Sequence, residues 1–201
     1  MSGLRLDGTV TKTQPADKPD RQQKILDAVL AVLARDGIAG VSVRAVAKEA
    51  GVANGLAGYY FEGKAGMVES ALHRIGEQDV ELLTPRPGTD PETAVRQALG
   101  RVASPRFLTT EYVTLRLQLW ALARVDPSFA EINSAAHHRY LDALAGLIAA
   151  ARPELTTSQI TRRATDIALI QNGIWLTSLL GVDREAVGRA VSRCEELALS
   201  S

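Results

Sequence analysis

Apolar residues recur with a helical period along almost the whole chain. Between Arg21 and Asp36 they follow the i, i+3, i+4 spacing of a helix that faces a core, and Gly37 stands where such a helix ends. Two short helical segments follow, from Val43 to Ala50 and from Ala53 to Tyr60. No window alternates apolar and polar residues for long enough to predict a strand. The pattern predicts an all-α protein with about nine or ten helices.

Capping and helix-breaking residues divide the rest of the chain. A long helix is predicted from Gly63 to about Leu83, and a proline-rich loop follows at residues 84–89. N-cap residues, two of them followed by proline at the first helical position, then predict helix starts at Asp90, Asp126, Thr156 and Asp183. These boundaries give a polar arm at 1–20, a three-helix unit at 21–67 and a larger helical domain at 68–201.

The net charge of the whole chain says little about function, but the charges of its two predicted parts differ. The 201 residues carry 23 basic and 23 acidic side chains, and a neutral chain is unusual for a nucleic-acid binder. The unit at 21–67, however, has six basic and four acidic side chains, against 14 and 16 in the domain at 68–201. A slightly basic N-terminal unit is compatible with DNA binding. A single cysteine and the lack of an apolar targeting run predict a cytoplasmic protein.

The unit at 21–67 has the layout of a helix-turn-helix module. In such a module the first short helix crosses the DNA backbone and the second enters the major groove. Gly51 would supply the tight turn, Val52 would pack the two helices together, and Ala47 is small enough for a close approach. A plain helical corner with the tyrosines in the core remains the alternative for any one of these residues.

The residues Ser42 to Val52 (SVRAVAKEAGV), then Gly55 and Tyr60 to Lys64 (YFEGK), resemble the DNA-binding domain of TetR-family transcriptional regulators. The resemblance implies a homodimer whose two recognition helices enter successive major grooves of a near-palindromic operator. It also implies a C-terminal domain with a small-molecule pocket and a dimer interface in the last two helices, for which we expect Ile160, Ala164, Ile167, Leu179, Val187 and Val191.

Carried over by position, the resemblance gives each residue of the module a role. Ser42 caps the first short helix, Arg44 reaches a base edge, and Phe61 belongs to the core. The full expected DNA-binding set is Ser42, Arg44, Ala53, Asn54, Gly55, Leu56, Tyr59, Tyr60 and Lys64. Asn54 and Leu56 would read sequence, and the tyrosines and Lys64 would contact phosphates. Ala53 and Gly58 stand where a capping Ser or Thr and a phosphate-binding Tyr are common, which weakens two contacts.

The C-terminal domain is similar to the betaine-pathway, choline-sensing branch of the family. The similar segments are Leu119 to Ala123, Asp126-Pro127, Arg139-Tyr140 and Gly173 to Leu176, but Asn172 replaces the usual Asp, so choline as effector does not follow. Aromatic residues with a few polar ones are typical of such pockets. The expected lining is Phe107, Glu111, Tyr112, Trp120, His137, Tyr140, Gln171, Asn172 and Trp175.

Catalysis is disfavoured by the absence of site motifs. His137 and His138 are adjacent and therefore point to different sides of a helix, and His73 is remote, so no metal site is expected. Cys194 lies beside Glu195 and Glu196, which would raise the pKa of the thiol. We therefore expect a ligand-responsive repressor without cofactor, metal or membrane partner. A DNA-binding dimer controlled by a partner protein, with no small ligand, is the alternative.

Overall fold

The computed structural model describes residues 18–181 and 183–200, and every regular element in them is helical. Nine α-helices and one short 3₁₀ helix are present in this part of the chain. Their bounds are α1 (Lys18–Gly40), α2 (Val43–Ala50), α3 (Asn54–Tyr60), α4 (Gly63–Leu83), α5 (Pro91–Val102), η1 (Pro105–Phe107), α6 (Thr110–Leu122), α7 (Pro127–Ala151), α8 (Thr157–Ser178) and α9 (Arg184–Leu199). The all-α prediction is confirmed.

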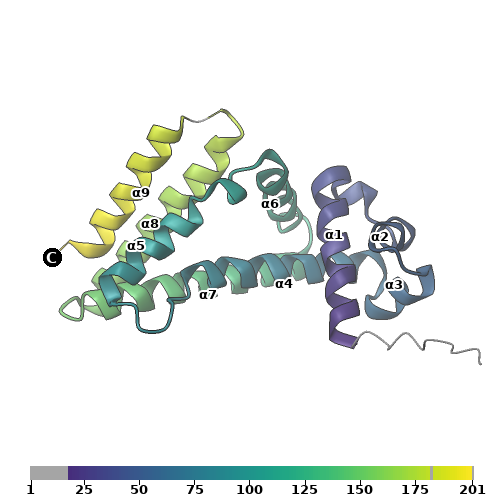
Figure 1. The fold of residues 1–201 in the computed structure, drawn as a ribbon, viewed down its shortest axis with the longest axis horizontal. Helices are drawn as coiled ribbons and strands as arrows, with labels where there is room; N and C mark the ends of the chain where they lie inside the picture. The colour runs from purple at the N-terminus through teal and green to yellow at the C-terminus, as the bar shows by residue number, and fades with distance from the viewer. Residues whose placement is uncertain (1–17, 182, 201) are drawn as a thin grey trace, which may run out of the picture.

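The helices form a head and a body joined by one long helix (Figure 1). We call residues 18–67 the head and residues 68–181 and 183–200 the body. Helices α4 and α7 lie side by side along the long axis, and α1, α2 and α3 stand at one end of them. Helices α5, α8 and α9 pack together at the other end, and α6 lies between the two groups. Because α4 begins in the head and ends in the body, it connects the two directly.

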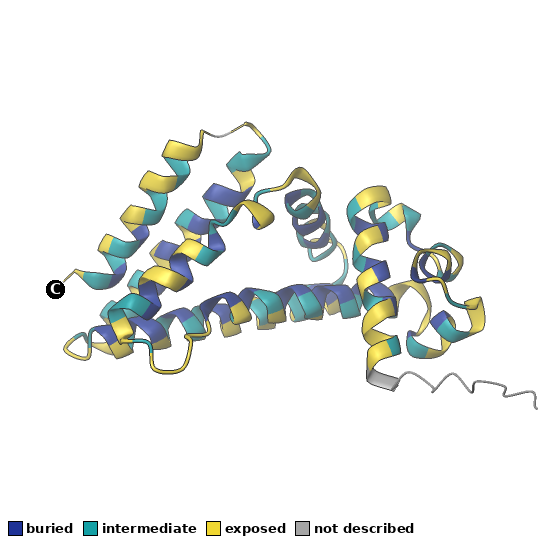
Figure 2. Cartoon of the chain, viewed as in Figure 1, coloured by how far each residue is buried: buried dark blue, intermediate teal, exposed yellow. Residues whose placement is uncertain are grey.

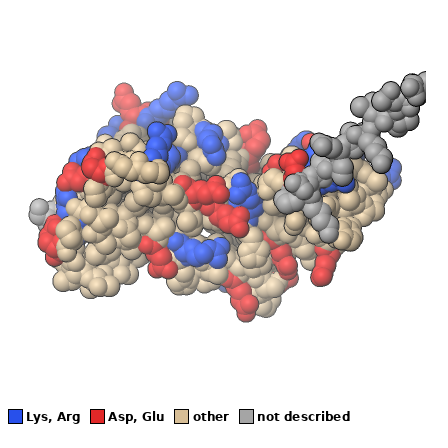
Figure 3. All heavy atoms as spheres, turned by 60° about the horizontal axis from the view of Figure 1, so that its bottom comes forward, with Lys and Arg blue, Asp and Glu red and all other residues tan. Residues whose placement is uncertain are grey.

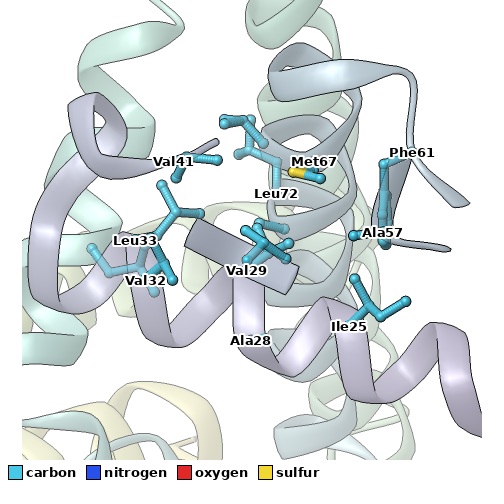
Figure 4. Packing of buried hydrophobic residues seen from close by; sticks show 14 of the residues in the cluster. Ile25, Ala28, Val29, Val32, Leu33, Val41, Ala57, Phe61, Met67 and Leu72 are labelled. Atoms are coloured by element: carbon cyan, nitrogen blue, oxygen red, sulfur yellow. The ribbon is translucent and has the colours of Figure 1, made fainter. Parts of the chain in front are cut away.

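The head is built on an apolar core under α1 (Figure 4). Ile25, Val29 and Leu33 on one face of α1 are fully buried, and they meet Ala57 of α3 and Met67 of α4. The predicted core position of Phe61 is confirmed, since its side chain is 5% exposed. The body completes this core, because Leu115, Leu119 and Phe129 belong to the same cluster.

Helix α1 begins at Lys18, three residues before the predicted start at Arg21 and inside the predicted arm, and its first segment ends at Gly37 as predicted. Gly37 does adopt a left-handed φ of 70°, but the chain resumes helical structure after this kink and continues to Gly40. The side chain of Gln118 on α6 comes close here, and a Cβ at residue 37 would lie 3.3 Å from it. Glycine therefore serves both the kink and the close contact between head and body.

The body has a second core, and its helices turn their buried faces inward (Figure 2). Leu99, Leu144 and Ile148 from α5 and α7 are almost completely buried. Two residues expected at a dimer interface also lie here, because Ala164 and Ile167 are 1% and 0% exposed within the chain itself. The expectation for these two is therefore wrong: they pack into the core of their own body and cannot cover a partner.

Charged side chains of both signs are interspersed over the face of the molecule drawn in Figure 3. Of the helices in the described ranges, none is long and apolar enough to cross a membrane.

Candidate DNA-binding surface and effector cavity

Local hydrogen bonds fix the relative position of α2 and α3. The Ser42 hydroxyl accepts a hydrogen bond from the backbone N–H of Ala45 at 3.2 Å, as an N-cap does. Gly51 ends α2 with φ 65° and ψ 40°, a left-handed conformation that favours glycine. The next N–H, of Val52, donates to the carbonyl oxygen of Ala47 at 3.0 Å. This turn orients α3 on the surface of the head.

Seven of the nine residues expected to contact DNA are exposed, and Leu56 and Tyr60 are half-buried. Leu56 packs against the head core, which holds α3 in place. The Tyr59 side chain is 70% exposed, and its ring meets that of Tyr60 edge to face with centroids 5.5 Å apart. The structure thus presents this polar and aromatic set at the surface, as a helix-turn-helix requires.

Two cations on this surface are free to meet an anion. Arg44 on α2 and Lys64 in the first turn of α4 are exposed, and neither forms an ion pair with any residue that the structure describes. Arg35 differs, because it donates to both Asp36 and Glu49 at 2.9 Å. Helix α3 lacks a side-chain cap, since Ala53 has no side-chain oxygen to accept a hydrogen bond from the first turn.

A cavity of about 290 Å³ lies in the body where α4, α6, α7 and α8 meet. Its wall is formed by Asp79, Arg116, Trp120, Asn133, Ala136, His137, Tyr140, Asn172 and Trp175. A smaller hollow of about 30 Å³ continues along α4 beside Ile75 and Gly76. The cavity therefore lies next to the helix that connects body and head.

A buried ion pair joins α4 to α6 across the cavity wall. The Nη1 of Arg116 donates to the two carboxylate oxygens of Asp79 at 2.7 and 2.8 Å. Burial raises the pKa of Asp79 above its ordinary value. For Arg116, burial alone would lower the pKa, but the adjacent Asp79 carboxylate outweighs it and raises the pKa. Arg116 therefore keeps its positive charge inside the body.

The structure brings five of the nine predicted pocket residues together on the cavity wall. These are Trp120, His137, Tyr140, Asn172 and Trp175. Gln171 lies behind the wall, where its side-chain oxygen accepts a hydrogen bond from the Tyr140 hydroxyl. Tyr112 lies beside the ion pair, with its hydroxyl 3.2 Å from Arg116 Nη1, and Phe107 packs behind Tyr112 at 5.1 Å between ring centroids.

Glu111 is the exception, because it is exposed in the first turn of α6 and is not part of the cavity wall. Asp79 and Arg116 were not among the predicted pocket residues, although they carry the only charges among the nine wall residues. A signal for both exists in the sequence. Asp79 occupies the apolar stripe of α4, four residues after Ile75, and Arg116 lies three residues after the buried Val113. A charged residue at a core position indicates a buried partner.

Reactive groups elsewhere in the described chain are not arranged for catalysis. Burial, with a smaller contribution from Glu195, raises the pKa of the Cys194 thiol to about 11. The thiolate is the nucleophilic form, so this thiol is inert near neutral pH. No three His, Cys, Asp or Glu side chains are grouped so as to hold a metal ion anywhere in residues 18–181 and 183–200.

An exposed helix-turn-helix on a helical body that contains a cavity is the architecture of a DNA-binding regulator. The family model "Bacterial regulatory proteins, tetR family" matches residues 25–71, and the model "BetI-type transcriptional repressor, C-terminal" matches residues 91–200. The chain belongs to the TetR family of DNA-binding transcriptional regulators and has a BetI-type C-terminal domain. Because this is a family of regulators, the prediction that the chain is not an enzyme is confirmed.

The chain is similar to known regulators at low sequence identity. The HTH-type transcriptional regulator BetI of Klebsiella pneumoniae is 23% identical over 167 residues, which cover 81% of this chain and 84% of the relative. A TetR regulator from Haloarcula marismortui has a TM-score of 0.76 at 19% identity, with 90% and 97% of the two chains covered. A Saccharomonospora viridis regulator solved in complex with choline has a TM-score of 0.71 at 18% identity, with 89% and 95% covered. At this identity the two structures show a shared fold.

Proposed function

We propose that the chain is a repressor that leaves a near-palindromic operator when a small molecule enters the body cavity. One observation carries the proposal: the cavity wall and the DNA-binding surface share a helix. Lys64 lies in the first turn of α4 and Asp79 lies in the cavity wall, about four turns and about 22 Å further along. A ligand that displaces Asp79 therefore moves the base of the head.

Helix α6 gives the cavity a second connection to the head. Arg116 and Trp120 face the cavity, whereas Leu115 and Leu119 on the same helix belong to the head core. A shift of α6 thus reaches α1 through packed side chains. The operator requires two recognition helices about 34–36 Å apart, so a small rotation of each head disfavours DNA binding. Ligand and operator then oppose each other reciprocally, with a coupling of about 1–3 kcal/mol.

The operator-binding form is proposed to be a homodimer that pairs through α8 and α9. Large apolar side chains remain exposed on α8 and just after its end. Leu169 and Leu176 are 65% and 50% exposed, and Leu180, after the end of α8, is 82% exposed. Leu169 and Leu176 are seven residues apart and lie on the same face of α8. Of the interface residues expected from the sequence, Ile160, Leu179, Val187 and Val191 are half-buried and have surface to contribute. Leu176→Glu should lower the dimer fraction in sedimentation velocity.

A small-molecule effector is favoured over control by a partner protein because the body has a cavity to receive one. The S. viridis regulator holds choline, which is a small organic molecule. We place the protein in the cytoplasm, together with the DNA it binds. The arm at 1–20 lies outside the described residues, apart from the start of α1, so a DNA contact by the arm stays a prediction.

A gel-shift assay against the DNA upstream of its own gene tests the DNA-binding part. Arg44→Ala should cost about 1–3 kcal/mol in operator binding and reduce the preference for the operator over a scrambled duplex.

Lys64→Ala should weaken binding to both duplexes, because it removes a phosphate contact. It should also reduce the slope of log affinity against log salt concentration by about one unit. Arg86→Ala, exposed in the loop between α4 and α5, is the matched control and should change neither. Equal affinity of the wild-type protein for operator and scrambled DNA would refute the proposal that it is a repressor.

A further inference from the structure

The charges of the cavity wall are already paired with each other. The side chains of Arg116 and Asp79 are 8% and 12% exposed, and one nitrogen of the guanidinium, Nη1, bonds both carboxylate oxygens. The same nitrogen lies 3.2 Å from the Tyr112 hydroxyl. The carboxylate of Asp79 is therefore not free to bind a cationic ligand.

The guanidinium also occupies the aromatic part of the wall. Its central carbon lies 4.0 Å from the centroid of the Trp175 ring and 5.5 Å from that of Trp120. Aromatic faces beside a carboxylate are the environment that a quaternary ammonium ligand seeks. In this protein that environment is filled by the protein's own cation.

The guanidinium retains unused hydrogen-bond donors. It has five N–H groups, and Nη1 accounts for two of them. Its Nε is buried without a hydrogen-bond partner, and Nη2 makes no hydrogen bond to any of the residues described. Nε is shielded from the cavity, so Nη2 is the nitrogen that can donate to a carboxylate there in a charge-assisted hydrogen bond. The other polar wall residues, Asn133, Asn172 and His137, contribute no fixed charge that would repel an anion.

We propose that the effector is a small organic acid with an apolar body, whose carboxylate binds Nη2 of Arg116. This inference rests on the proposed function and assigns the chemical class of its effector. Trp120, Tyr140 and Trp175 line the cavity and offer apolar surface to the body of the ligand. The acid and Asp79 then bind different nitrogens of one guanidinium, so the ligand competes for the contact that joins α6 to α4.

The two tryptophans of the chain provide the assay. The sequence contains Trp120 and Trp175 and no other tryptophan, and both line the cavity. Intrinsic fluorescence of the full-length protein therefore reports occupancy directly. The probes are hexanoate, 1-hexanol and hexyltrimethylammonium, which share one alkyl chain and do not absorb at the excitation wavelength. Hexanoate should bind about tenfold or more tightly than 1-hexanol, because a charge-assisted pair replaces a neutral hydrogen bond. Hexyltrimethylammonium should bind more weakly than hexanoate.

Variants of Arg116 test the assignment to this side chain. Arg116→Lys keeps the charge and the pairing with Asp79 but has no second nitrogen left for the ligand carboxylate, so the preference for hexanoate should fall about tenfold. Arg116→Met, where circular dichroism shows it folded, should reverse the preference, because Asp79 and the tryptophans then face the ammonium. Arg106→Lys is the control, since its exposed guanidinium stacks on Phe107 at 4.3 Å and is not part of the cavity wall.

The outcomes separate this inference from the proposed function. Tighter wild-type binding of hexyltrimethylammonium, equal binding of hexanoate and 1-hexanol, or no fluorescence response to hexanoate would each overturn the acid-binding cavity. Selective operator binding in the gel shift would remain intact in all three cases. If hexanoate binds but leaves operator affinity unchanged, the cavity is as inferred and the release mechanism fails.

Discussion

The head and the body of this chain place their polar groups in opposite ways. Under α1 the core of the head is entirely apolar, and its charged side chains lie on the surface. The buried polar or charged residues within the described chain are Asp79, Arg116 and Gln171, and all three belong to the body. Closely packed apolar side chains resist rearrangement, so the head is suited to hold α3 in a fixed position. A hollow lined by paired polar groups can be rearranged by a ligand that offers new partners.

Separating the buried pair should produce the largest effect. Asp79→Asn and Arg116→Met each leave a buried group without its partner, and each should lower the free energy of unfolding by about 3–5 kcal/mol. The double variant Asp79→Leu, Arg116→Met removes both charges and should be nearly as stable as the wild type. Urea unfolding followed by circular dichroism measures all three. A double variant as unstable as the singles would mean that the cavity wall depends on more than charge pairing.

Gly76→Ala tests how closely α4 and α7 are packed beside the cavity. A Cβ at residue 76 would lie 2.8 Å from the Cβ of Ala136, so the helices must move apart. Overpacking of this kind should destabilise the protein by about 1–3 kcal/mol and shift operator affinity through α4. Gly146→Ala is the matched control on α7, because no atom lies within 4 Å of its Cβ. The control should raise the melting temperature, since alanine favours a helix.

Ala53→Ser adds the missing cap to α3 in the head. Ala53 has φ −68° and ψ 145°, which suit an N-cap serine. The hydroxyl should satisfy an N–H of the first turn and stabilise the protein by about 1 kcal/mol. Ser42→Ala makes the reverse change at α2 and should cost about as much. Thermal unfolding of both variants measures the difference, and equal melting temperatures would mean that tertiary packing alone determines these short helices.

Arg35→Ala should have the smallest effect, although it removes two ion pairs at once. Arg35 pairs with Asp36 and Glu49 on the surface of the head, and its side chain is 56% exposed. Solvent screens such pairs, so the melting temperature should stay within experimental scatter. A clear loss of stability, approaching that of Arg116→Met, would mean that ion pairs on the surface of the head matter as much as the buried pair in the body.

Local chemistry made most of the fold predictable. A capping side chain needs only its own first turn, and Ser42, Asp90 and Thr156 accept the expected hydrogen bonds. The predicted end of the first segment of α1 coincides with the break at Gly37, whereas its start at Lys18 was missed because Lys18, Pro19 and Asp20 add nothing to the apolar pattern.

The cavity was predictable only in part. Trp120, Tyr140 and Trp175 are conspicuous because large aromatic residues are rare in this chain, at 4% of its residues. Asp79 and Arg116 are separated by 37 positions, and their meeting depends on how α4 and α6 are rotated toward each other. No local pattern specifies that rotation. The polar residue within an apolar stripe was the only local trace of the pair.

The contact between Gln118 and the kink at Gly37 gives the head a second attachment. One attachment is covalent, through α4, and the other is the packing of α6 against α1. Phe129 of α7 also belongs to the core of the head, so head and body are joined by continuous packing and not by a flexible linker. A substitution that loosens this shared core should therefore change the orientation of α3 as well as the stability of the protein.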